Sequence, residues 1–158
     1  MKNKRKSTRN DFCTISLGYV HSRKGTFKQK YLKRARILLD TGCGGTLINK
    51  DLATKLKTKT CATATWSTKA GSFTTSNKVQ CNFTLPEFHE GRDICWNMYV
   101  DESDSKLCNY DMIIGRDLLQ VLGMDFSFST KMMTWDGAQV PMKHLDCFLE
   151  ENITKTEQ

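Results

Sequence analysis

The chain has 158 residues, of which 39% are hydrophobic and 26% are charged, as in an ordinary globular protein with one core. No apolar run approaches the roughly 20 residues that a membrane helix needs, and the basic N-terminus leads into polar residues, unlike a secretory signal peptide. We therefore expect an intracellular, cytoplasmic protein without membrane contact.

The cysteines show no pattern of a metal site or of a disulfide framework. There are seven of them: Cys13, Cys43, Cys61, Cys81, Cys95, Cys108 and Cys147. Their number is odd, and none forms a Cys-x-x-C pair or a short Cys/His spacing. We expect free thiols, no bound metal and no cofactor.

Positive charge is concentrated at the N-terminus. Residues 1–36 contain twelve Lys or Arg and one acid, a net charge of +11, whereas the rest of the chain carries −4. Residues 1–11 are interpreted as a basic arm that could contact RNA phosphates weakly through counterion release. The alternative is a solvated tail or a fragment of a longer polyprotein, and no motif of an RNA-binding fold favours the first interpretation.

The first third of the chain predicts a hairpin followed by a helix. Residues 12–20 alternate loosely between apolar and polar types, Gly25 marks a turn, and residues 28–39 form the returning strand. Residues 49–56 then predict a short helix with Asn49 as its N-cap.

The middle of the chain is rich in Thr, Ser and β-forming residues. Residues 61–85 predict two or three strands, with a hairpin tip at about residues 68–72. Residues 86–93 read as a loop, residues 94–100 as another strand, and residues 101–109 as an acidic connector.

A strand and a short helix are predicted within residues 110–123. The apolar strand ends at Gly115, three leucines follow at helical spacing, and Gly123 ends the helix. Short strands with a turn at Asp136-Gly137 then complete a domain over residues 12–142. We expect residues 143–158 to be a polar tail or linker.

The most informative segment is Asp40-Thr41-Gly42, which occurs once and follows the apolar residues 37–39. The order places one carboxylate at the rigid end of a buried strand, and Gly42 lets backbone or substrate approach closely. If Asp40 is catalytic, its partner carboxylate must come from a second copy of the chain.

Together with Ile113-Ile114-Gly115-Arg116, this segment resembles the retropepsins, the retroviral-type aspartic proteases. Residues 122–126 and 133–137 are most similar to proteases within polyproteins of gypsy-like LTR retrotransposons. The resemblance implies an all-β, barrel-like acid-protease fold with a flap hairpin, one or two short helices and half of an active site in each chain.

The resemblance also implies roles for individual residues. Asp40 would be catalytic, and Thr41 would hydrogen-bond across the two-fold axis, although it could instead be a local turn hydroxyl. Gly42 would present its backbone to the substrate. Ala70 and Gly71 would lie in the flap and bind substrate, unless this segment is an ordinary surface hairpin. A structural role is implied for Ile113, Ile114, Gly115 and Arg116.

The sequence departs from familiar retroviral members just after the triplet, at Cys43-Gly44-Gly45. In some of those enzymes an Asp at the second of these positions pairs with the helix Arg, and Gly44 cannot do so. Arg116 is therefore expected to pair with Asp117 or with an acid of the other subunit. Cys43 is interpreted as a small apolar residue because no Cys/His nucleophile pattern surrounds it.

The implied function is an aspartic endopeptidase, active as a homodimer on a peptide or polyprotein substrate, in the cytoplasm or within virus-like particles. Two carboxylates about 3 Å apart share a proton, so one activates a water while the other acts as acid, best under mildly acidic conditions. Two alternatives stay open: a retropepsin-like domain that dimerises or binds peptides with weak catalysis, and a basic RNA-binding module.

Overall fold

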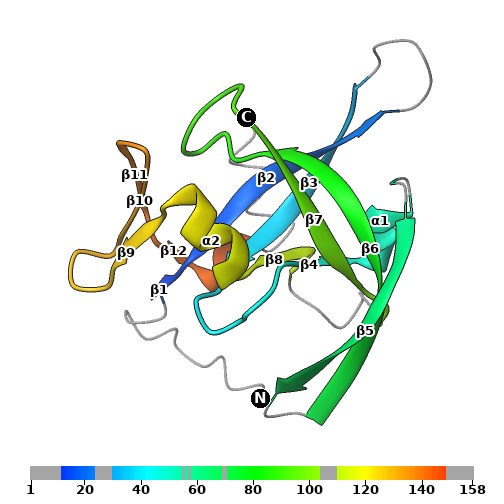
Figure 1. Ribbon diagram of the computed structural model, residues 1–158. Helices are drawn as coiled ribbons and strands as arrows, with labels where there is room; N and C mark the ends of the chain where they lie inside the picture. The colour runs from blue at the N-terminus through cyan, green and yellow to red at the C-terminus, as the bar shows by residue number, and fades with distance from the viewer. Residues whose placement is uncertain are drawn as a thin grey trace, which may run out of the picture.

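The computed structural model describes residues 12–23, 30–54, 56, 58–68, 71–103 and 110–148. Most of these residues lie in strands, with two short α-helices and one 3-10 helix (Figure 1). The strands are β1 (Phe12–Cys13), β2 (Ile15–Arg23), β3 (Lys30–Leu39), β4 (Leu47–Asn49), β5 (Thr58–Thr68), β6 (Gly71–Thr84), β7 (Asp93–Asp101), β8 (Met112–Ile114), β9 (Asp125–Ser127), β10 (Met132–Trp135), β11 (Ala138–Pro141) and β12 (Lys143–His144). The helices are α1 (Lys50–Ala53), α2 (Arg116–Leu122) and the 3-10 helix Leu145–Phe148. The expected all-β class is confirmed.

The main sheet is closed on itself. Its seven strands lie in the order β2-β3-β8-β4-β7-β6-β5, and β2 also pairs with β6. That additional pairing runs antiparallel from Tyr19 opposite Thr84 to His21 opposite Asn82. Closure removes the edges that an open sheet would expose, and β5 alone extends outward from the ring, paired with β6. The expected barrel-like architecture is therefore present.

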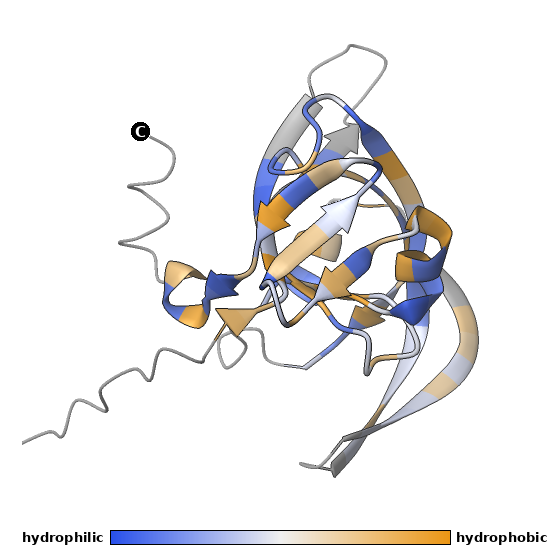
Figure 2. Cartoon of the chain, turned by 90° about the vertical axis from the view of Figure 1, so that its left-hand side faces the viewer, coloured by the Kyte–Doolittle hydropathy of each residue, from blue (hydrophilic) through white to orange (hydrophobic). Residues whose placement is uncertain are grey.

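The interior of the barrel is filled by alternate residues of its strands. In β3, Ala35, Ile37 and Leu39 are fully buried, whereas Arg36 and Leu38 between them are only half-buried. This two-residue period of burial is the pattern of a strand with one face in the core. Figure 2 shows hydrophobic and hydrophilic residues following one another along the strands of the barrel. The six ring strands each contribute to one apolar cluster, which includes Val20, Ile37, Ile48, Phe83, Met98 and Met112.

The predicted local elements are largely confirmed. Strands β2 and β3 form the first hairpin, with Ile15 opposite Leu38 at its open end. The Asn49 side chain caps α1 by accepting a hydrogen bond from the Leu52 amide at 2.9 Å. Helix α2 ends at Gly123, whose φ of 70° is the left-handed conformation that glycine adopts without strain.

Two other hairpins that the sequence predicts are present in the structure. Between residues 61 and 85 the chain forms the paired strands β5 and β6, the lower of the two strand numbers expected. Asp136 and Gly137 connect β10 to β11 with φ values of 46° and 81°, the two positive values that a two-residue hairpin turn requires.

The ordered chain continues past residue 142. Strand β12 pairs antiparallel with β1, placing His144 opposite Phe12, and the 3-10 helix that follows buries Phe148. The fold therefore reaches Phe148, and part of the segment expected as a polar tail belongs to it. Among the residues that the structure describes, no helix is long and apolar enough to cross a membrane.

Candidate active site

Asp40 lies where β3 ends, and its backbone is held on both sides. Its amide donates a hydrogen bond to the Ile114 carbonyl of β8 at 2.8 Å. The preceding residue, Leu39, donates its amide to the Thr14 carbonyl at 2.8 Å and accepts from the Thr14 hydroxyl at 2.6 Å. The carboxylate thus projects from a backbone whose position is fixed by two other segments of the barrel.

The turn after Asp40 is open to its surroundings. The Gly42 amide donates to Asp40 Oδ1 at 2.8 Å, and the Cys43 amide donates to the Asp40 carbonyl at 3.3 Å. Asp40 is half-buried, whereas Thr41 and Gly42 are exposed. The Thr41 hydroxyl makes no hydrogen bond with any residue described, so a local bond to this hydroxyl does not hold the turn.

Gly115 allows the segment after the turn to lie directly on the β8–α2 junction. A Cβ atom at residue 115 would lie 2.2 Å from the Gly45 carbonyl oxygen and 2.7 Å from the Cys43 carbonyl oxygen. The Arg116 amide donates to that Cys43 carbonyl at 2.8 Å. Only a residue without a side chain permits this approach, so Gly115 is a structural requirement of the site.

Thr46 and Asp117 join the same two segments through side chains. The Thr46 hydroxyl donates to Asp117 Oδ1 at 2.7 Å and accepts from the Gly115 amide at 3.2 Å. Asp117 Oδ2 accepts from the Trp96 indole and from the Thr46 amide, both at 3.3 Å. Thr46 is fully buried, so its hydroxyl satisfies the buried Gly115 amide, which has no access to water, and also binds the half-buried Asp117.

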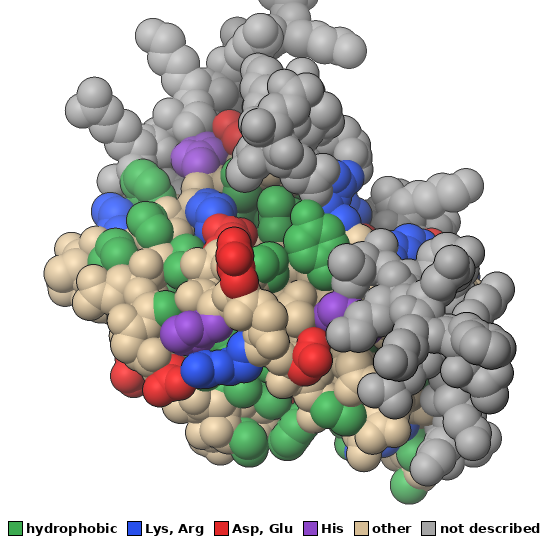
Figure 3. Space-filling view, turned by 90° about the horizontal axis from the view of Figure 1, so that it is seen from above, with side chains coloured by type: hydrophobic (Ala, Val, Ile, Leu, Met, Phe, Trp, Pro, Cys, Tyr) green, Lys and Arg blue, Asp and Glu red, His purple; other side chains and the backbone are tan. Residues whose placement is uncertain are grey.

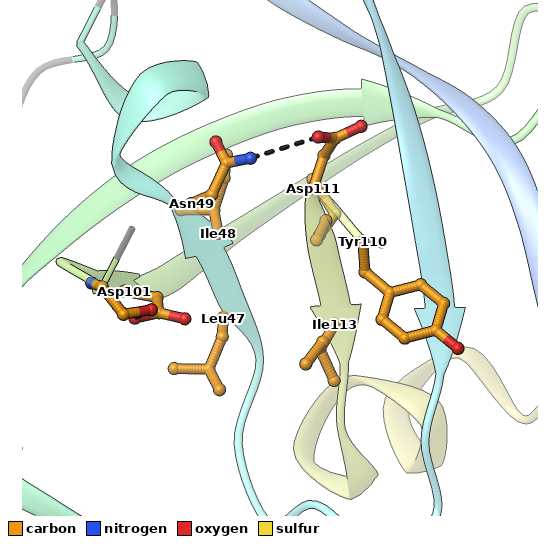
Figure 4. A pocket seen from close by; sticks show the side chains of 9 residues that line it. Leu47, Ile48, Asn49, Asp101, Tyr110, Asp111 and Ile113 are labelled. Atoms are coloured by element: carbon orange, nitrogen blue, oxygen red, sulfur yellow. Dashed lines mark hydrogen bonds between the residues drawn. The ribbon is translucent and has the colours of Figure 1, made fainter. Parts of the chain in front are cut away.

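A second network fixes the strands beneath the turn. Arg36 donates to Asp111 through Nε and Nη2, each at 3.1 Å, and Asn49 Nδ2 donates to Asp111 Oδ1 at 3.2 Å. These bonds join β3 and β4 to the residue that precedes β8, at the polar end of a shallow cavity of about 40 Å³ (Figure 4). Arg36 and Asp111 form a bidentate ion pair, the geometry that gives such pairs their directionality.

The other end of this cavity is apolar. Leu47 and Ile113 are register partners on β4 and β8, and Ile113 is also opposite Leu38 on β3. Alternation along β3 directs Leu38 and Asp40 to the same face of the sheet. Three apolar side chains therefore lie side by side across three strands, on the face to which the carboxylate is directed.

Comparison with known proteins identifies the fold. The chain matches the crystal structure of the retroviral protease-like domain of Ddi1 from Leishmania major with a TM-score of 0.52 and 18% sequence identity, over 85% of this chain and 95% of that one. It also matches EIAV protease complexed with the inhibitor HBY-793, with a TM-score of 0.49 and 18% identity, over 77% and 98% of the two chains. The chain has a retropepsin-like fold. No protein-family model matches the sequence, and no curated protein does so either.

Within this retropepsin-like fold, Arg116 is the first residue of α2, and its guanidinium lies near the turn that follows Asp40. Its Nη2 atom is 3.6 Å from the position that a Cβ atom of residue 44 would occupy. Asp117, one of the two expected partners, instead bonds Thr46 and Trp96. Arg116 is exposed and forms no ion pair with the described part of the chain, so an acid of a second subunit remains the predicted partner.

Cys43 has the surroundings of a protonated thiol. Its Sγ donates to the Gly45 carbonyl at 3.2 Å. Burial raises the pKa of the Cys43 thiol above its ordinary value, and the nearby Asp40 carboxylate raises it as well, although hydrogen bonding from the Gly45 backbone opposes them. A raised pKa leaves little thiolate at neutral pH, which agrees with the interpretation of Cys43 as a small packing residue.

The segment expected to be the flap is the tip of the β5–β6 hairpin. Gly71 begins β6, and Ala70 lies outside the described residues. The structure thus confirms a hairpin here, and its role as a flap stays a prediction.

Two residues of the site were missed by sequence reasoning in the roles that they hold. Thr46 and Asp117 form the hydrogen bonds that join the turn to α2, although Asp117 was considered only as a partner for Arg116. A single hydroxyl at the entrance to a buried strand is a weak signal for such a role, because its partner lies 71 residues away.

Proposed function

We propose that the chain is an aspartic endopeptidase that acts as a homodimer. The observation that carries this proposal is the position of Asp40: a half-buried carboxylate at the end of β3, with its amide bonded to the Ile114 carbonyl at 2.8 Å. The retropepsin-like fold supports it. Rigid placement matters because two carboxylates must meet within hydrogen-bond reach of one water.

The second carboxylate would come from another copy of the chain. Asp40 makes no contact with another acid among the residues described, and the tripeptide occurs once. Thr41 and Gly42 are exposed beside it, as expected of residues that a second subunit would cover. We propose that Thr41 braces the two turns across the dimer axis and that Arg116 pairs with an acid of the other subunit.

The reaction needs only these two carboxyl groups and water. The ionised carboxylate takes a proton from water, whose oxygen then bonds to the carbonyl carbon of the scissile peptide. The protonated carboxyl gives its proton to the carbonyl oxygen, and the C–N bond breaks as the leaving nitrogen is protonated. No cofactor enters this sequence. Because one carboxyl group must hold a proton, activity is expected to be greatest under mildly acidic conditions.

The substrate would be an extended peptide, held between the Asp40 turn and the β5–β6 hairpin. Leu38 and Ile113, both half-buried and next to the buried Leu47, offer an apolar surface beside the carboxylate, which favours an apolar side chain next to the scissile bond. Processing of a retroelement polyprotein, of the gypsy-like LTR type, in the cytoplasm or within virus-like particles, is the proposed biological setting.

Two other functions compete with this proposal. A domain that dimerises or binds peptides with weak catalysis would have the same fold, but it would not need an intact Asp40-Thr41-Gly42. A basic RNA-binding module depends on residues 1–11, which lie outside the described residues. Among the described residues visible in Figure 3, basic and acidic side chains lie intermixed.

The decisive experiment uses self-cleavage of a precursor that contains this chain. Wild type is expected to release products with new termini, and Asp40→Asn is expected to abolish release while sedimentation still shows a dimer. Asp125→Asn, at an exposed position of β9, is the matched control and should cleave normally. Cleavage by Asp40→Asn at the wild-type rate would refute the proposal.

The same measurements separate the two alternatives. A wild-type dimer that never cleaves would favour the peptide-binding domain. Salt-dependent RNA binding that survives removal of residues 1–10 would favour the RNA-binding module.

A further inference from the structure

The indole ring of Trp66, in strand β5, lies on Gly45 in the segment after the Asp40 turn. A Cβ atom at residue 45 would be 2.4 Å from Cη2, 3.2 Å from Cζ3 and 3.4 Å from Cζ2 of this ring. All three nearest atoms belong to Trp66. The ring therefore occupies the space that any side chain at residue 45 would need.

The ring is held in this place by the hairpin and by β7. Trp66 Nε1 donates to the buried Thr75 hydroxyl of β6 at 2.9 Å. The Tyr99 ring of β7 packs edge-on at a centroid distance of 5.1 Å, and Phe73 of β6 stacks at 6.3 Å. Aromatic pairs of this kind add to the energy of area burial, so the position of the indole follows the position of the hairpin.

Gly45 is also connected to the carboxylate turn. Its carbonyl accepts the Cys43 thiol at 3.2 Å, and the Cys43 amide donates to the Asp40 carbonyl. On its other side, Gly45 lies against Gly115. A continuous series of contacts thus runs from the hairpin, through Trp66 and Gly45, to Asp40.

We propose that Trp66 is a positioning residue that transmits the position of the β5–β6 hairpin to the Asp40 turn. This inference rests on the proposed function: an extended peptide that engages the hairpin would, through Trp66, fix the turn in its reactive geometry. The chain needs glycine at residue 45 because the indole must reach the backbone there. Loss of the contact lowers the rate of the chemical step more than the affinity for peptide.

A cycle of variants tests the coupling. Gly45→Ala adds a methyl group that clashes with the Trp66 ring and displaces the Asp40 turn. We expect it to lower kcat by about tenfold to a hundredfold, with a smaller change in KM, because a small displacement of a reacting group lowers the rate of the chemical step strongly. Trp66→Leu removes the obstacle, so Gly45→Ala/Trp66→Leu should be no less active than Trp66→Leu alone. Gly44→Ala is the matched control, because its Cβ meets only Arg116 Nη2 at 3.6 Å. Additive losses in the double variant would overturn the proposal, as would a full-rate Gly45→Ala.

A second readout does not depend on cleavage. The alkylation rate of Cys43, followed by peptide mass spectrometry, reports the position of the turn, and Trp66→Leu is expected to raise it several-fold while circular dichroism stays that of a folded protein. Gly44→Ala should leave it unchanged. An unaltered Cys43 rate in Trp66→Leu would overturn the inference even in an active enzyme. If wild type cleaves nothing, the proposed protease function fails, and the alkylation rates still decide whether Trp66 positions the turn.

Discussion

The Thr46 hydroxyl donates to Asp117 Oδ1 at 2.7 Å and at the same time accepts the Gly115 amide at 3.2 Å. Thr46→Val keeps the shape of the side chain but leaves the buried Gly115 amide without this acceptor, while Asp117 Oδ1 keeps only its bond from the Leu118 amide. We expect it to lower the free energy of unfolding by about 1–3 kcal/mol, the cost of an unpaired buried polar group. Urea denaturation measures the difference, and Thr46→Ser, which retains the hydroxyl, is the control. Equal stability of the Val and Ser variants would contradict this role.

Gly115→Ala should be among the most damaging single changes in the chain. The added methyl group would lie 2.2 Å from the Gly45 carbonyl oxygen, a backbone atom that cannot move without moving the turn. We expect a loss of about 3 kcal/mol or more in unfolding free energy, together with loss of cleavage. Gly44→Ala adds the same methyl group where its only neighbour, Arg116 Nη2 at 3.6 Å, is in ordinary van der Waals contact. If the two variants have the same thermal midpoint, the contact at Gly115 is not a constraint.

Gly44→Asp is expected to stabilise the chain. A carboxylate at residue 44 can reach Arg116, whose Nη2 lies 3.6 Å from the Cβ position. The pair is exposed, so the expected gain over Gly44→Asn is only about 0.2–1 kcal/mol, and it should shrink in high salt. Comparison with Asn removes the effect of replacing glycine itself. A gain equal in Asp and Asn at low salt would mean that no ion pair forms.

The stability of the fold should fall in alkaline solution. Burial raises the pKa of the Cys81 thiol to about 12, and its neighbour Cys95 contributes to the rise. The unfolded chain loses this proton near the ordinary thiol pKa, so between about pH 9 and 12 the folded state binds more protons and stability decreases as pH rises. The slope approaches about 1.4 kcal/mol per pH unit for this one group.

Cys81→Ala tests this assignment. It should remove the Cys81 share of the alkaline slope while leaving the slope from other groups. Denaturant titrations between pH 8 and pH 11 give the slopes of the two proteins. Cys61→Ala, which changes a half-buried thiol of β5 that does not contribute to the raised pKa of Cys81, is the control. An alkaline slope that Cys81→Ala leaves intact would assign the effect to another group.

Much of the fold follows from local patterns in the sequence. The end of β3 at Asp40, the cap at Asn49 and the turn at Asp136-Gly137 each depend on residues within a few positions of one another, and each was predicted. Two such local segments, residues 38–42 and 113–116, carry the resemblance to retropepsins. Local chemistry of this kind can be read without knowing the register of distant strands.

The remaining features depend on distant partners. Thr46 and Asp117 meet because β4 and β8 are neighbours, and Trp66 reaches Gly45 because the hairpin lies over the turn. No periodic pattern in the sequence predicts either contact. Strand β12 was expected as part of a tail because Lys143 and His144 are polar, and only pairing with β1 makes them a strand.

The reciprocal bonds between Thr14 and Leu39 limit where this domain can change in length. They fix the open end of the β2–β3 hairpin beside Asp40, and the register then runs without interruption to Arg23 opposite Lys30. Deleting one residue within β2 would break these bonds or turn every later side chain to the opposite face. Insertions between residues 23 and 30 would leave this register intact. Changes in length are therefore expected to be tolerated at the end of the hairpin farthest from the carboxylate, where they leave the geometry around Asp40 unchanged.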